Sequence, residues 1–133
     1  MANYLYYDYL HSAVCKVKED EIESVACTNV DAYLNALCIK KGSTLKGRRL
    51  SMQQQMHIKR YVPVVVDKET IYFPIHPIHR YDCIWVFYPN IESITYQKKM
   101  CIIHFRDHTH LKCLYPQRVR RNCYLIRQYL QML

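Results

Sequence analysis

The amino-acid sequence predicts a single α+β domain over residues 1–133, built as an antiparallel β-sheet or open barrel with three helices. Its length suits one domain and is short for two. Half of its residues are apolar, which is enough for a substantial hydrophobic core. Many short runs are rich in β-branched and aromatic residues and are separated by turn residues, whereas a few segments repeat their apolar residues with the helical period. The short runs predict the sheet, and the periodic segments predict the helices.

The first quarter of the chain alternates loosely between apolar and polar residues, which fits short antiparallel strands. A helix is expected near 29–41, where apolar residues recur at positions i, i+3, i+4, i+7 and i+8. These residues are Val30, Tyr33, Leu34, Leu37 and Cys38. Thr28 or Asn29 is suited to cap the start of this helix, and Gly42 is suited to end it. A second helix is expected near 48–57, because this stretch is polar, free of glycine and tolerant of helix.

From Tyr61 onward, short β-type runs alternate with turn signals such as Pro89-Asn90 and predict an antiparallel meander. A third helix is expected near 116–132, at the end of the chain. Pro116 suits the first helical position, and an apolar stripe on this helix would pack on the sheet. The stripe consists of Val119, Cys123, Ile126 and Leu130.

Charge is distributed in blocks along the chain, whose net charge is +8. Residues 1–39 carry two lysines and six acidic residues, residues 40–60 carry seven Lys or Arg and no acid, and residues 61–133 carry ten Lys or Arg and five acids. A charge that served only solubility would be mixed along the chain, so the blocks indicate an acidic partner. Nucleic acid is the commonest such partner, and a membrane surface and an acidic protein are the alternatives.

The most basic block also contains the two glycines of the chain, Gly42 and Gly47. Lys and Arg neutralise phosphates, glycine lets the backbone approach closely, and Arg can enter the narrow minor groove of A/T-rich DNA. We therefore predict a DNA-binding surface, to which the C-terminal helix adds further basic residues. The predicted DNA-binding residues are Lys40, Lys41, Lys46, Arg48, Arg49, Lys59, Arg60, Arg120, Arg121 and Arg127. The alternative is a solvated loop together with an ordinary polar helix face.

A zinc site is the main alternative chemistry for the histidines and cysteines. His76, His79 and Cys83 have the spacing H-x2-H-x3-C, and Zn²⁺ takes such ligands. Further candidates downstream are His104, His108, His110 and Cys113. However, the chain has no C-x-x-C knuckle, and its cysteines fall mostly within apolar segments, where a cysteine is ordinarily a core residue. We therefore predict no metal site, and we expect the seven cysteines to be reduced core residues of a cytoplasmic protein.

Other chemistries lack their motifs. No nucleophile elbow, phosphate loop or pair of catalytic carboxylates stands out, so we predict neither an enzyme nor a bound cofactor. No apolar run approaches the length of about 18 residues that would indicate a membrane-spanning helix. The N-terminal sequence MANYLYYDYL lacks a basic start and a continuous apolar stretch, so a signal peptide is not expected.

A series of short landmarks follows the first predicted helix in a fixed order. The helix ends in a cysteine, which leads into G-S-x-x-x-G-R, then a basic pair before P-V-V-V-D, then an F-P segment, and then C-x-W at the start of a strand. The matching positions are Cys38, Gly42, Ser43, Gly47, Arg48, Pro63, Asp67, Phe73, Pro74, Cys83 and Trp85. In this order and spacing the sequence resembles the competence transcription factor (ComK) family of Gram-positive bacteria over roughly residues 30–130. Thr44 stands where the family has a second serine.

The resemblance implies a transcription activator that binds paired A/T-rich boxes of double-stranded DNA, largely through the minor groove, and switches on genes for DNA uptake (competence) and recombination. It also implies a homo-oligomer, with RNA polymerase and an adaptor of the Clp protease system as further partners. Longer members carry a C-terminal tail that this adaptor recognises, whereas this sequence ends at Leu133. We therefore expect a short form without the tail. The alternative function is a protein-interaction regulator that modulates a partner transcription factor without binding DNA itself.

Overall fold

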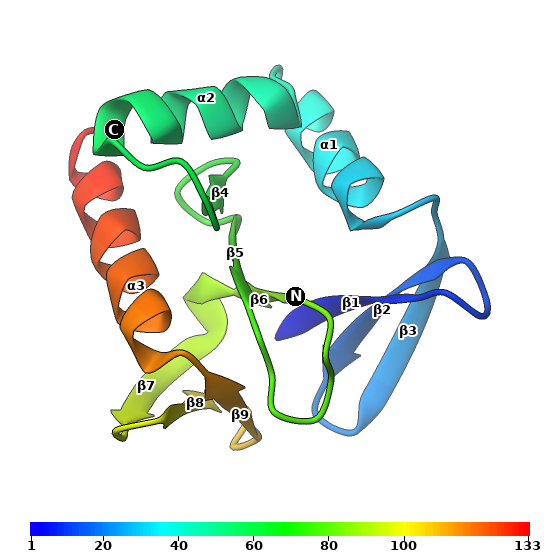
Figure 1. The fold of residues 1–133 in the computed structure, drawn as a ribbon. Coiled ribbons are helices and arrows are strands. Elements are labelled where there is room, and N and C mark those ends of the chain that lie inside the picture. Colours follow the sequence, from blue (N-terminus) through cyan, green and yellow to red (C-terminus); the bar gives the residue numbers. More distant parts are fainter.

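The computed structural model describes all 133 residues and contains two antiparallel β-sheets and three helices (Figure 1). The larger sheet has six strands in the order β3-β2-β1-β6-β5-β4. Their bounds are β1 Tyr4–Asp8, β2 Ala13–Lys18, β3 Glu21–Ala26, β4 Val64–Val65, β5 Ile71–Ile75 and β6 Ile84–Phe87. The pairing of β1 with β6, in which Leu5 lies opposite Trp85, joins the N-terminal strands to the later ones. β3 forms one outer edge of this sheet, and most of its side chains are exposed.

The smaller sheet has three strands in the order β7-β8-β9. Their bounds are β7 Ile91–Tyr96, β8 Met100–Phe105 and β9 His110–Leu114. A single turn of 3-10 helix, η1 Tyr88–Asn90, leads from β6 into β7. The prediction of an α+β fold with an antiparallel sheet is confirmed, and the sheets do not close into a barrel.

All three predicted helices are present, and Figure 1 shows α2 crossing between α1 and α3. Their bounds are α1 Val30–Lys40, α2 Leu45–Met56 and α3 Pro116–Gln131. Asn29 caps α1, because its Oδ1 accepts a hydrogen bond from the Ala32 N–H at 2.7 Å. Gly42 has a φ of +77° and follows the end of α1, as expected for a glycine that terminates a helix. None of the helices combines the length and the apolar surface needed to cross a membrane.

The start of α2 differs from the sequence prediction, because the helix begins at Leu45 rather than near residue 48. Thr44 caps it: its Oγ1 accepts a hydrogen bond from the Gly47 N–H at 3.0 Å. Gly47 therefore lies in the first turn of a helix and does not form a flexible loop. A Cβ atom at Gly47 would lie 3.2 Å from Thr44 Oγ1, which is a tight contact, so glycine leaves room for the capping hydroxyl.

Two hydrophobic cores flank the larger sheet. Alternate side chains of β5 enter different cores, since Phe73 belongs to the larger core and Tyr72 to the smaller one. α2 contributes to both, with Met52 in the larger core and Leu45 in the smaller one. α2 therefore ties the part of the molecule around α1 to the part around α3 and fixes how the basic residues of the three helices lie relative to one another.

Candidate nucleic-acid interface

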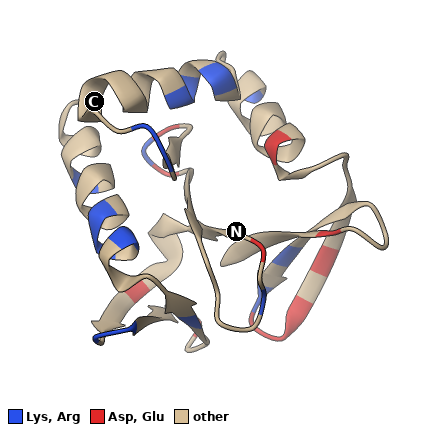
Figure 2. Cartoon of the chain, in the orientation of Figure 1, with Lys and Arg blue, Asp and Glu red and all other residues tan.

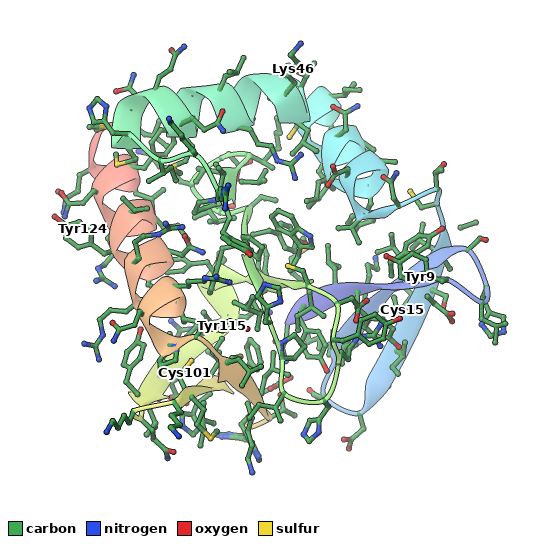
Figure 3. All side chains as sticks on the ribbon, viewed as in Figure 1. Tyr9, Cys15, Lys46, Cys101, Tyr115 and Tyr124 are labelled. Carbon is green, nitrogen blue, oxygen red and sulfur yellow. The ribbon has the colours of Figure 1, made fainter.

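The predicted DNA-binding residues all lie on the three helices and on the segment that follows α2. Lys40 and Lys41 lie at the end of α1, and Lys59 and Arg60 lie between α2 and β4. Figure 2 shows Lys and Arg on α2, on α3 and on the segment before β4, whereas acidic residues gather on β3 and the turn that precedes it. In Figure 3 the Lys46 side chain points away from the body of the protein. The acidic residues of β3 therefore lie apart from the basic residues of α2 and α3, whereas Asp31 on α1 lies beside Arg49.

Arg48 is held at the junction of α1 and α2. Its Nε donates a hydrogen bond to Ser43 Oγ at 2.8 Å, and Ser43 Oγ in turn donates to the Cys38 carbonyl oxygen at 3.3 Å. The Leu45 N–H donates to Asn35 Oδ1 at 2.9 Å across the same junction. The landmark residues of this segment therefore form one hydrogen-bonded corner, and Arg48 helps to hold the fold together.

Arg49 is paired with an acid from the N-terminal part of the chain. Its Nη1 and Nη2 donate to the two carboxylate oxygens of Asp31 at 3.2 and 3.1 Å, and its guanidinium lies 5.6 Å from the centre of the Trp85 ring. This paired, stacked geometry suits a structural role, and it offsets the charge of a residue that the sequence predicted to contact DNA.

Most of the predicted residues have no carboxylate partner. Lys41 Nζ lies 3.4 Å from Asp67 Oδ2, and Lys41 and Arg49 are the two predicted residues that form salt bridges. The eight without a carboxylate within 4.0 Å are Lys40, Lys46, Arg48, Lys59, Arg60, Arg120, Arg121 and Arg127. Their charge is free to attract a polyanion, so the acids of the N-terminal quarter do not neutralise the predicted surface as a whole.

The first turns of α3 hold three arginines in defined positions. Arg121 Nη2 donates to the Arg60 carbonyl oxygen at 3.1 Å, which places the segment before β4 beside α3. The Arg120 guanidinium lies 4.3 Å from the centre of the Tyr96 ring. Arg118, which the predicted set leaves out, lies 4.3 and 4.4 Å from the rings of Tyr61 and Tyr115. The sequence places Arg118 in the same basic run as Arg120 and Arg121, at the start of the predicted C-terminal helix.

The histidines and cysteines do not assemble a metal site. Nowhere in the chain do three or more His, Cys, Asp or Glu side chains come together as metal ligands. Burial raises the pKa of Cys83 to about 11, so its thiol stays protonated at neutral pH. Burial and the nearby Arg118 charge lower the pKa of His76, so its imidazole adds no charge to this surface. All seven cysteines are unpaired thiols, and five of them are buried.

Comparison with known proteins places the chain in a family. A family model described as "ComK protein" matches residues 1–115, which end just before α3. No curated protein and no solved structure matches the chain. The match includes every landmark position from Cys38 to Trp85. It begins at residue 1, whereas the resemblance in the sequence begins near residue 30. ComK is a family of transcription factors rather than enzymes, and membership suggests a competence transcription factor. The chain belongs to the ComK family.

Proposed function

We propose that this protein is a transcription activator that binds A/T-rich boxes of double-stranded DNA, largely through the minor groove, and switches on competence genes. The observation that carries the proposal is the group of eight predicted basic residues without carboxylate partners on the three helices and the segment before β4. Membership of the ComK family supports the same function. Phosphate neutralisation by such residues supplies most of the non-specific affinity of DNA-binding proteins.

The separation of charge gives the molecule an orientation toward DNA. Acidic residues gather on β3 and the turn before it, away from α2 and α3 (Figure 2). A polyanion is repelled by the first region and attracted by the second, so encounters are steered toward the helices. Lys40, Lys46, Lys59 and Arg60 are exposed and act as phosphate anchors in this proposal.

Specificity rests on the shape of the DNA rather than on a unique base code. The minor groove distinguishes A/T from G/C pairs and little else, whereas A-tracts narrow the groove and strengthen its negative potential. The protein binds as a homo-oligomer in the cytoplasm. Each of two copies binds one box, so only paired boxes at the matching distance are bound by both copies. RNA polymerase and a Clp-system adaptor are the further partners that the proposal takes from the resemblance.

The proposal is tested by fluorescence anisotropy with an A/T-rich and a G/C-rich duplex of equal length, each over a salt series. We expect tighter binding to the A/T-rich duplex. Neutralisation of about six phosphates gives a slope near −5 in a plot of log affinity against log salt. Equal binding to both duplexes would contradict minor-groove selectivity, and an absence of binding would contradict the proposal as a whole.

One observation favours the alternative, a regulator that binds a partner transcription factor. The turn between β1 and β2 exposes Tyr9 and Leu10, at 73% and 86%, and the loop between β5 and β6 exposes Tyr81 at 97%. The Arg80 Nη2 donates to the Tyr7 carbonyl oxygen at 3.4 Å and so links the two segments. Exposed apolar side chains of this size are typical of protein interaction sites. If no duplex is bound, loss of partner binding on replacement of Tyr9, Leu10 and Tyr81 by serine would support this alternative.

A further inference from the structure

Four arginines of the chain stack on aromatic rings, and they fall into two kinds. Arg49 lies over Trp85 and Arg80 lies over Tyr6, and each also binds both oxygens of a carboxylate. Arg118 and Arg120 also lie over rings, but their side chains form no salt bridge and donate no hydrogen bond to the protein. The stacking fixes the guanidinium plane in both kinds, and in the second kind the N–H groups remain available to a ligand.

Of the two stacked arginines without a carboxylate partner, Arg118 has the more restricted surroundings. Its guanidinium lies within 4.4 Å of the centres of two rings, Tyr61 and Tyr115, and its side chain is partly buried. The His76 ring supports both tyrosines, since it meets them edge-on at 5.6 and 5.4 Å between ring centres. Tyr115 is labelled at the start of α3 in Figure 3. A guanidinium held in this way loses little conformational freedom when it binds an anion.

Both tyrosines hold an unusual backbone conformation. The φ angles of Tyr61 and Tyr115 are 53° and 56°, in the left-handed region that a bulky side chain rarely adopts. The two residues are far apart in the sequence, yet both place their rings against the same guanidinium. Backbone strain of this kind persists where the surrounding structure imposes it, and it is concentrated at ligand-binding and active sites.

The charge around Arg118 also lacks a counterion. Arg118, Arg120 and Arg121 lie in the first two turns of α3, whose first turn contains no acidic residue. This is the positive end of the helix dipole, where cations are unfavourable and anions are stabilised. Arg121 holds the Arg60 backbone close by, so a further basic residue is anchored to the same region. In the free protein these charges repel one another, and a bound anion would relieve the repulsion.

We propose that Arg118, held between Tyr61 and Tyr115, binds a phosphodiester group of the duplex DNA backbone. The N–H edges of its guanidinium would donate to the two non-bridging oxygens of one phosphate. The identity of the polyanion rests on the proposed function. Arg118 itself lies on α3, beyond the residues 1–115 that match the family, whereas Tyr61 and Tyr115 lie within them.

The test compares Arg118→Gln with Arg80→Gln in the full chain. Arg80 is the matched control, because it also stacks on a tyrosine at 4.3 Å but its donors bind Asp82. On the A/T-rich duplex we expect Arg118→Gln to weaken binding about tenfold and to reduce the salt slope by about one. Arg80→Gln should leave both values unchanged. Equal binding by Arg118→Gln and the parent protein would overturn the site and leave the proposed function intact.

A second variant tests whether the rings of Tyr61 and Tyr115, here called the aromatic clamp, contribute to binding beyond the charge of Arg118. Tyr61→Asn with Tyr115→Asn keeps the net charge, and asparagine tolerates the left-handed conformation, so the fold should be retained. We expect weaker DNA binding with the parent salt slope, because Arg118 is present but no longer held in place. Unchanged affinity would show that Arg118 acts only as a diffuse charge and would overturn the clamp.

A third measurement applies if no duplex is bound at all, which would defeat the proposed function. Pyrophosphate is then added to the full chain, and the Nε–Hε NMR signal of Arg118 is followed. A saturable shift of the Arg118 signal, with the Arg80 signal unmoved, would retain an anion site at this position. No shift would overturn it.

Discussion

The starts of α2 and α3 carry similar groups of arginines and use them in opposite ways. At the start of α2, Arg48 donates through Nε to Ser43, and Arg49 donates through both Nη groups to Asp31. At the start of α3, Arg118 and Arg120 rest on tyrosine rings and donate to no protein group. The density of basic residues in a sequence therefore does not decide which of them can bind a polyanion. The decisive property is where the hydrogen bonds of each guanidinium go.

The difference has a local cause. α1 and α2 are joined by a short connection, and hydrogen bonds at this junction hold the two helices together at an angle (Figure 1). Asp31 in the first turn of α1 can therefore reach Arg49 in α2. α3 follows a β-strand instead, and its first turn meets tyrosines and a backbone carbonyl but no acid. The arginines of α3 are consequently positioned without being neutralised.

The largest expected effect is the loss of DNA binding when the start of α3 is neutralised. The triple variant Arg118→Gln, Arg120→Gln, Arg121→Gln should weaken binding to the A/T-rich duplex about 100-fold or more at 0.1 M salt (an order-of-magnitude estimate from about 1 kcal/mol per contact), and it should reduce the salt slope by about three. Fluorescence anisotropy provides both values. The control neutralises exposed lysines elsewhere, with Lys18, Lys68 and Lys112 replaced by glutamine. Equal losses in the two triple variants would mean that only net charge matters and that the contrast between the helices is irrelevant to binding.

The next effect concerns stability at the start of α2. Arg49→Ala should lower the free energy of unfolding by about 1–2 kcal/mol, because it removes both an exposed ion pair and a stacking contact with Trp85. Urea unfolding measures this value. A double-mutant cycle with Asp31→Asn should give a coupling energy of about 0.2–1 kcal/mol. An additive cycle would show that the paired geometry contributes nothing and would remove the structural role assigned to Arg49.

The smallest effect tests whether Arg49 can also reach DNA once it is released. Asp31→Asn removes its carboxylate partner and should tighten duplex binding about threefold, with a slightly steeper salt dependence. Glu23→Gln is the control, since it also removes one negative charge but lies on β3 beside Lys16. If both variants tighten binding equally, the gain comes from net charge, and Arg49 makes no contact of its own.

Much of the fold could be predicted from local sequence signals. The helices predicted near 29–41 and 116–132 are observed at 30–40 and 116–131, because apolar periodicity, Asn29 and Pro116 are local features. The helix predicted near 48–57 begins earlier, at Leu45, and Thr44, whose hydroxyl caps it, is the local signal for this start. The pairing of β1 with β6 could not be predicted, since alternation identifies strands but not their neighbours.

The candidate site was less predictable for a related reason. The basic residues were identified from composition, but their availability depends on partners that are distant in sequence. Asp31 is 18 residues from Arg49, and Tyr61 lies in the segment between α2 and β4, far from Arg118 in the sequence. Such contacts are set by tertiary packing, so the sequence could identify a basic surface without separating structural arginines from available ones.

The outer edge of the larger sheet has a consequence for the behaviour of the protein in solution. β3 leaves one row of backbone groups without a partner strand, and Ile22 on this strand is 60% exposed. Bare strand edges recruit other chains and start aggregation, and charged side chains discourage such growth. Here Glu21 and Glu23 do so. Replacement of both glutamates by glutamine would therefore favour pairing of the β3 edges of two copies of the protein.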